Sequence, residues 1–83
     1  MENYARTPKQ IGEILHRIRR NFPMSQKELA EISGLWQETI SKIESGARGT
    51  KLETLCDILA ALDYEMMIIP RRKSSPSEIE DMF

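Results

Sequence analysis

The sequence predicts an all-α fold of four or five short helices, followed by one short β-strand. Helix-capping signals stand before apolar residues that are spaced three and four apart, and glycine or proline follows most of these segments. The strand is predicted over residues 64–69, which are bulky or β-branched and end at Pro70. A chain of 83 residues has the length of one domain.

The first helix is expected from residue 7 to about residue 20. Thr7 and Gln10 form a capping box, and Pro8 takes the first helical position, where a missing N–H has no cost. The apolar residues of this segment share one face: Ile11, Leu15 and Ile18. His16 lies on the outer side of the helix, where we expect it to be solvated.

Residues 25–45 predict two helices joined by a tight turn. A capping box at Ser25 begins the first helix, Gly34 supplies the permissive backbone of the turn, and Gly46 stops the second helix. Five apolar residues are expected to meet in one small core: Leu29, Ile32, Leu35, Ile40 and Ile43. This layout is that of a helix-turn-helix, whose second helix can enter the major groove of DNA.

The last helix is expected to begin at a capping box over residues 50–53 and to break at Asp63. Its apolar stripe carries Leu52, Leu55, Leu59 and Leu62, with Ile58 beside it. Cys56 is expected near this stripe as a small buried residue. The chain thus divides into three predicted parts: a DNA-binding domain (1–63), a dimerising strand (64–70) and a flexible tail (71–83).

Composition excludes several function classes. One Cys excludes an internal disulfide, and one Cys with one His makes a zinc site unexpected, so we expect no metal or other cofactor. No membrane span or secretory signal is visible, so we expect a cytoplasmic protein. No catalytic constellation or phosphate-binding glycine loop is present, which favours a binding protein over an enzyme with a small-molecule substrate. Charge is also divided, with nine Lys/Arg and six Asp/Glu over residues 1–51 but three and seven thereafter.

The helix-turn-helix segment resembles a known family. Residues 24–30 (MSQKELA), Gly34 and residues 40–46 (ISKIESG) resemble the phage-repressor/Cro-like (XRE-type) proteins, and residues 52–55 (LETL) extend the match. The continuation into a strand and a charged tail is similar to the HipB antitoxins of that family. The resemblance implies a lambda-repressor-like fold that represses its own operon on operator double-stranded DNA and binds a HipA-like kinase toxin. We also expect a homodimer, because a lone strand after a helical bundle leaves its backbone N–H and C=O groups unpaired unless it pairs with the same strand of a second chain.

The resemblance also assigns site residues by position. The expected base-reading residues are Gln37, Glu38, Ser41 and Lys42. The expected contacts to the DNA backbone are Gln26, Lys27, Trp36, Thr39, Arg48, Thr50 and Lys51. The expected dimer strand presents Tyr64, Met66, Met67, Ile68 and Ile69, and the expected structural ion pair joins Arg19 to Glu44.

Two departures from the family pattern bear on function. Trp36 stands where a small hydroxyl residue is usual, so the reading helix lacks its expected cap. Glu38 brings a negative charge that can accept a hydrogen bond from cytosine but repels phosphates. Two alternatives to the antitoxin therefore stay open: a protein-interaction module with weak or lost DNA binding, and a plain small repressor unrelated to a toxin. The tail could present Ile79, Met82 and Phe83 to a partner as a short helix.

Overall fold

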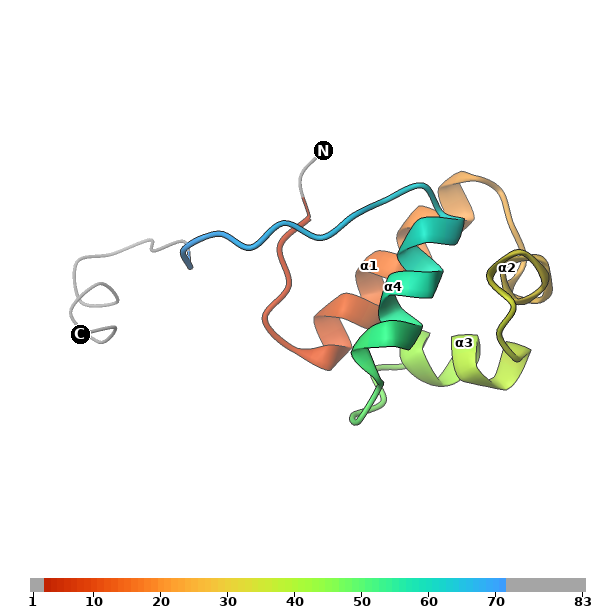
Figure 1. The fold of residues 1–83 in the computed structure, drawn as a ribbon, viewed down its shortest axis with the longest axis horizontal. Coiled ribbons are helices and arrows are strands. Elements are labelled where there is room, and N and C mark those ends of the chain that lie inside the picture. Colours follow the sequence, from red (N-terminus) through yellow and green to blue (C-terminus); the bar gives the residue numbers. More distant parts are fainter. Residues whose placement is uncertain (1–2, 72–83) are drawn as a thin grey trace.

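The computed structural model describes residues 3–71, which form an all-α bundle of four helices (Figure 1). The helices are α1 (Pro8–Asn21), α2 (Gln26–Ser33), α3 (Gln37–Glu44) and α4 (Leu52–Ala61). Helix α3 packs against α1 and α2, and α2 also packs against α4. The predicted helical fold is confirmed, with four helices in the described residues.

One small core holds the helices together. Its buried residues come from all four helices and the residue that follows α4: Leu15, Ile18, Leu29, Ala30, Ile40, Ile43, Ile58 and Leu62. Three residues expected at or near the core are exposed instead: Ile32 (60%), Leu52 (66%) and Cys56. Two residues turn a helix by about 200°, so Ile32 faces away from Ala30, and Cys56 faces away from Ile58. Leu52 is the first residue of α4 and lies at the rim of the core.

The predicted capping boxes have three different outcomes. The box at Ser25 is complete, with the Glu28 N–H donating to Ser25 Oγ (3.0 Å) and the Ser25 N–H donating to Glu28 Oε1 (3.1 Å). At α1, the Thr7 hydroxyl accepts from the Gln10 N–H (3.1 Å), but the Gln10 side chain accepts from the Arg6 N–H (2.6 Å) instead of closing the box. The prediction of a capping box at residues 50–53 is wrong, because the N-cap of α4 is Lys51 and no side chain caps this helix.

Gly12 brings α1 against the C-terminal end of α3. A Cβ at this buried position would lie 2.4 Å from the carbonyl oxygen of Ile43 and 2.8 Å from that of Glu44. Only a residue without a side chain permits this approach. It puts the polar side of α1 next to Glu44, the last residue of α3.

Gly34, in the left-handed conformation with φ 75°, ends α2 and turns the chain toward α3. The Leu35 N–H then donates to the Ala30 carbonyl oxygen (3.0 Å), which closes the turn. The turn of the helix-turn-helix is therefore as predicted, with three residues between the two helices.

Residues 64–71 leave the bundle and run back past the segment before α1 (Figure 1). They contain no strand, and their apolar side chains are exposed, with Met67 at 81% and Ile68 at 99%. A strand needs a second strand with which to exchange backbone hydrogen bonds, so the dimer strand stays a prediction. Of the predicted tail (71–83), only Arg71 is among the described residues, and the rest lies outside them. No helix in the described part of the chain is long and apolar enough to cross a membrane.

Candidate nucleic-acid interface

Helix α3 has one buried side and one exposed side. Ile40 and Ile43 anchor it in the core. The four predicted base-reading residues share the opposite, solvent-exposed side: Gln37, Glu38, Ser41 and Lys42. Residues four apart on a helix lie one above the other, so these four form two adjacent rows that can meet base edges in a major groove.

Trp36 stands immediately before this face. It is the N-cap residue of α3, no side chain caps the helix there, and the indole is 82% exposed. The Trp36 carbonyl oxygen accepts from the N–H groups of Thr39 (3.0 Å) and Ile40 (3.2 Å), which starts the helix without a side-chain cap. Thr39 is partly buried beside the reading face. The absence of a side-chain cap agrees with the sequence prediction.

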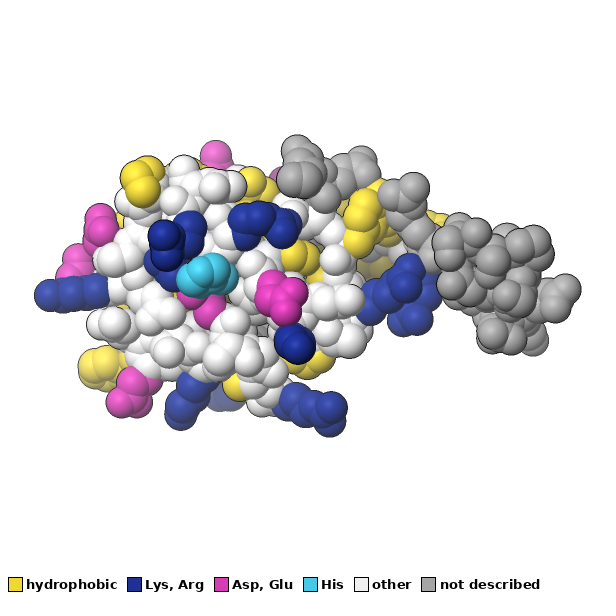
Figure 2. All heavy atoms as spheres, turned by 180° about the vertical axis from the view of Figure 1, so that it is seen from behind, with side chains coloured by type: hydrophobic (Ala, Val, Ile, Leu, Met, Phe, Trp, Pro, Cys, Tyr) yellow, Lys and Arg dark blue, Asp and Glu magenta, His cyan; other side chains and the backbone are white. Residues whose placement is uncertain are grey.

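The loop between α3 and α4 adds positive charge at the same edge of the molecule. Arg48, Thr50 and Lys51 are all exposed in this loop, which lies with α3 along the lower edge of Figure 1. Figure 2, seen from behind, shows Lys and Arg side chains along that lower edge. Such an edge suits the DNA backbone, because Lys and Arg contact phosphates irrespective of base sequence.

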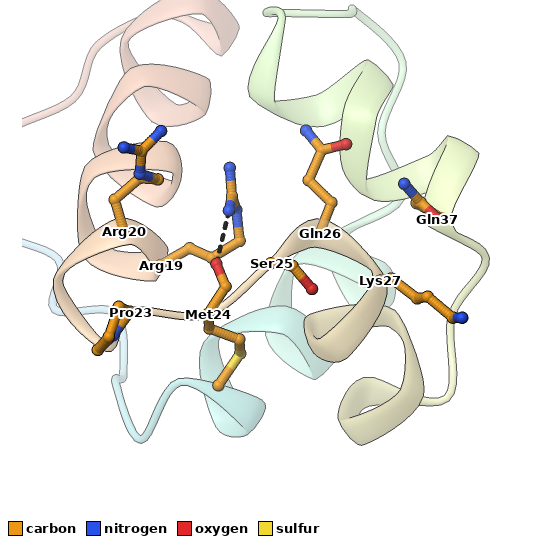
Figure 3. A pocket seen from close by; sticks show the side chains of 8 residues that line it. All are labelled: Arg19, Arg20, Pro23, Met24, Ser25, Gln26, Lys27 and Gln37. Atoms are coloured by element: carbon orange, nitrogen blue, oxygen red, sulfur yellow. Dashed lines mark hydrogen bonds between the residues drawn. The ribbon is translucent and has the colours of Figure 1, made fainter.

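A surface hollow of about 460 Å³ lies between the end of α1, the start of α2 and the start of α3 (Figure 3). Its lining residues are Arg19, Arg20, Pro23, Met24, Ser25, Gln26, Lys27 and Gln37. The hollow combines cationic side chains with the amides of Gln26 and Gln37, a chemistry that suits a phosphate. Arg20 was not among the predicted site residues, and only its basic character at the end of the first helix could have suggested it.

One lining residue, Arg19, forms the expected pair with Glu44, and the two side chains are only 7% and 5% exposed. The Arg19 Nε donates to Glu44 Oε2 (2.6 Å) and Nη2 donates to Oε1 (2.9 Å), while Nη1 donates to the Met24 carbonyl oxygen (2.6 Å). The pair therefore joins α1, the loop before α2 and the end of α3.

Burial by itself would raise the pKa of Glu44. Hydrogen bonds from Arg19, His16 and Gln26, together with the positive charge of Arg19, outweigh burial and leave this pKa below its ordinary value of 4.5. The hydrogen bond with Glu44 also raises the pKa of Arg19. Both side chains are therefore charged at neutral pH, and Glu44 can only accept hydrogen bonds.

Gln26 is anchored on this pair. Its Nε2 donates to Glu44 Oε1 (3.1 Å). Because a carboxylate only accepts, the amide nitrogen faces Glu44, and one N–H and the carbonyl oxygen remain for other partners. The phosphate contact predicted for Gln26 thus depends on a side chain that Glu44 already holds. Within residues 3–71, no group of three His, Cys, Asp or Glu side chains is placed to hold a metal ion.

The sequence matches the Helix-turn-helix family HTH_3 over residues 15–69. It is 31% identical to the antitoxin HipB of Escherichia coli (strain K12) over 74 residues, which are 89% of this chain and 84% of the antitoxin. It is 40% identical over 62 residues, or 75% of its length, to an uncharacterized HTH-type transcriptional regulator, y4dL, of Sinorhizobium fredii. The chain spans about a third of that regulator (32%).

The fold is also similar to that of a solved HipB. In the structure of a HipA-HipB-O2-O3 complex, the matching chain gives a TM-score of 0.79 at 28% identity, covering 86% of this chain and 100% of the other. The similarity therefore includes the whole of the solved chain and is not confined to the two helices of the motif.

Proposed function

The chain belongs to the HTH_3 helix-turn-helix family of DNA-binding transcriptional regulators, which are not enzymes, and from that premise we propose that it is the antitoxin of a HipA/HipB-like operon. In this role it represses its own operon as a homodimer and binds a kinase toxin. The observation that carries the proposal is the extent of the similarity. The match with HipB runs over 74 residues, which is longer than the helical part of the chain.

The exposed face of α3 supports DNA reading. Gln37 can contact adenine, Lys42 can contact guanine, and Ser41 can pair with several base edges. Glu38 can accept a hydrogen bond from cytosine, which narrows the range of DNA sequences that the protein binds well. The loop residues Arg48 and Lys51 then supply contacts to the backbone that do not depend on sequence.

Residues 64–69 support a homodimer. Their exposed apolar side chains and the absence of strand pairing in residues 64–69 favour pairing with the same segment of a second chain. A symmetric dimer presents two α3 helices to DNA about one helical turn, or a multiple of it, apart. The operator is then expected to be a palindrome.

The DNA-binding half of the proposal is tested with the DNA upstream of the chain's own gene. The wild-type protein should bind this fragment and should bind scrambled DNA of equal length more weakly, with an affinity that falls steeply with salt. Equal affinity for both fragments would contradict operator recognition. The antitoxin half is tested by co-expression with the kinase-like protein of a neighbouring gene, whose toxicity the chain should suppress and with which it should co-purify.

A second candidate function is a protein-interaction module with weak DNA binding. The exposed Glu38 on the reading face favours it, because this carboxylate repels phosphates. Glu38→Gln separates the two candidates. If the protein reads DNA, this variant should keep operator binding and lose preference at one base pair. If wild-type Glu38 blocks binding, the variant should gain affinity for all DNA sequences.

A further inference from the structure

Three helices meet at one oxygen atom of Glu44. Its Oε1 lies 2.9 Å from Arg19 Nη2, 3.1 Å from Gln26 Nε2 and 2.9 Å from His16 Nδ1. Arg19 and His16 come from α1, Gln26 is the first residue of α2, and Glu44 ends α3. His16 was expected to be merely solvated, and the structure assigns it a partner 28 residues away.

The chemistry of this contact fixes the proton of His16. Glu44 is ionised and has no hydrogen to give, so Nδ1 must carry the hydrogen in a bond of 2.9 Å. Arg19 Nη2 also lies 3.1 Å from Nδ1, but it cannot donate to a nitrogen that already carries a hydrogen. Arg19 Nη2 therefore donates to Glu44, and His16 donates to the same carboxylate in addition to Arg19 and Gln26.

The two oxygens of Glu44 have different tasks. Oε2 accepts from Arg19 Nε at 2.6 Å, and this bond ties α1 to α3 whether or not His16 is present. Oε1 holds Gln26 at the edge of the hollow next to Gln37. Half of the His16 side chain is exposed, so it adds little to the core, and its contact with Oε1 restrains the atom that anchors Gln26.

We propose that His16 is a positioning residue of the DNA interface, which acts through Glu44 to hold Gln26 for contact with the DNA backbone. The inference rests on the proposed DNA binding and adds a residue of α1 that contacts no base. His16 restrains the carboxylate of Glu44, and this carboxylate in turn holds the side-chain amide of Gln26. The amide is therefore already oriented when the protein binds DNA.

A double-mutant cycle on operator affinity tests this coupling. Loss of one hydrogen bond corresponds to roughly a two- to tenfold change in an equilibrium constant. His16→Ala and Gln26→Ala should each weaken binding within that range, and the double variant should bind like Gln26→Ala alone. His16→Asn, which can place an N–H near the Nδ1 position, should restore most of the affinity. Asn21→Ala, an exposed and uncharged change at the end of α1, is the matched control and should leave affinity unchanged.

A second measurement examines the contact without DNA. NMR of the imidazole nitrogens should find hydrogen on Nδ1 of His16 at neutral pH, and His16→Ala should shift the side-chain amide signals of Gln26 while the melting temperature stays within a few degrees. Three results would each overturn the role of His16. They are an Nδ1 without hydrogen, a double variant whose loss of operator affinity is the product of the two single losses, and full operator affinity in Gln26→Ala. A wild-type protein that does not prefer its own upstream DNA would instead overturn the proposed function, and with it this role.

Discussion

Replacing Glu44 by alanine should destabilise the fold more than any surface substitution. Arg19 and Glu44 are 7% and 5% exposed, and the guanidinium would lose both of its bonds to the carboxylate. Removing one partner of a buried pair costs about 3–5 kcal/mol, because the remaining charge stays buried without compensation. A domain of 83 residues has a total stability of about 4–12 kcal/mol. The variant should therefore lose a large share of its stability.

Thermal and urea unfolding followed by circular dichroism measure this loss. In a domain of this size, 1 kcal/mol shifts the melting temperature by about 4–8 °C, so Glu44→Ala should melt at least about 12 °C below the wild type. Glu13→Ala removes an exposed carboxylate from α1 and should stay within about 0.5 kcal/mol of the wild type. If Glu44→Ala lowers the free energy of unfolding by less than about 1 kcal/mol, the reasoning is refuted, because ion pairs on the surface contribute no more than that.

The double variant Arg19→Met/Glu44→Met tests the assumed cause. If the cost arises from an orphaned charge, replacing both charges with apolar side chains should recover much of the stability that Glu44→Ala loses. The wild type, the two single Met variants and the double variant form the cycle. A double variant whose loss equals the sum of the single losses would show that the charges do not act on each other.

Three further predictions concern acid, packing and DNA. Because the folded pKa of Glu44 lies below 4.5, its stabilisation is complete above that pH and is lost as the pH falls through the folded pKa; the free energy of unfolding should drop in acid, and less so in Glu44→Gln. Gly12→Ala should cost about 1–3 kcal/mol in urea unfolding, since its Cβ would meet the Ile43 carbonyl oxygen at 2.4 Å, and an unchanged midpoint would contradict the close approach. Gln37→Ala should cost about 1–3 kcal/mol on the operator and relax specificity at one base pair, whereas Arg48→Ala should weaken binding to every sequence and flatten its salt dependence.

Features set by neighbours in the sequence were predicted in part, since the capping box at residues 50–53 was wrong but two other local features were right. Ser25 and Glu28 are three residues apart, so their capping box could be read from the residue types alone. The turn at Gly34 was predicted on the same local grounds. The pair of Arg19 and Glu44 came from the family resemblance, because no local pattern joins residues 25 apart.

Features set by packing were missed or wrong. In helices of eight to ten residues, misplacing the buried face by two residues turns a core position into a surface position. Ile32 and Cys56 were assigned wrongly in this way. The place of Gly12 depends on how closely α1 and α3 approach, which no sequence spacing encodes. The contact of His16 with Glu44 depends on the same approach.

Trp36 gives this protein an optical property that suits its study. It is the sole tryptophan of the chain and is 82% exposed in the native state. Its emission wavelength should therefore change little on unfolding, and fluorescence melting curves of this protein should show no clear transition at the melting temperature. A DNA backbone that covers the start of α3 would shield the indole from water, so the same signal should report binding without any added label. One unmodified sample then yields two separate signals, with ellipticity following the fold and indole emission following the complex.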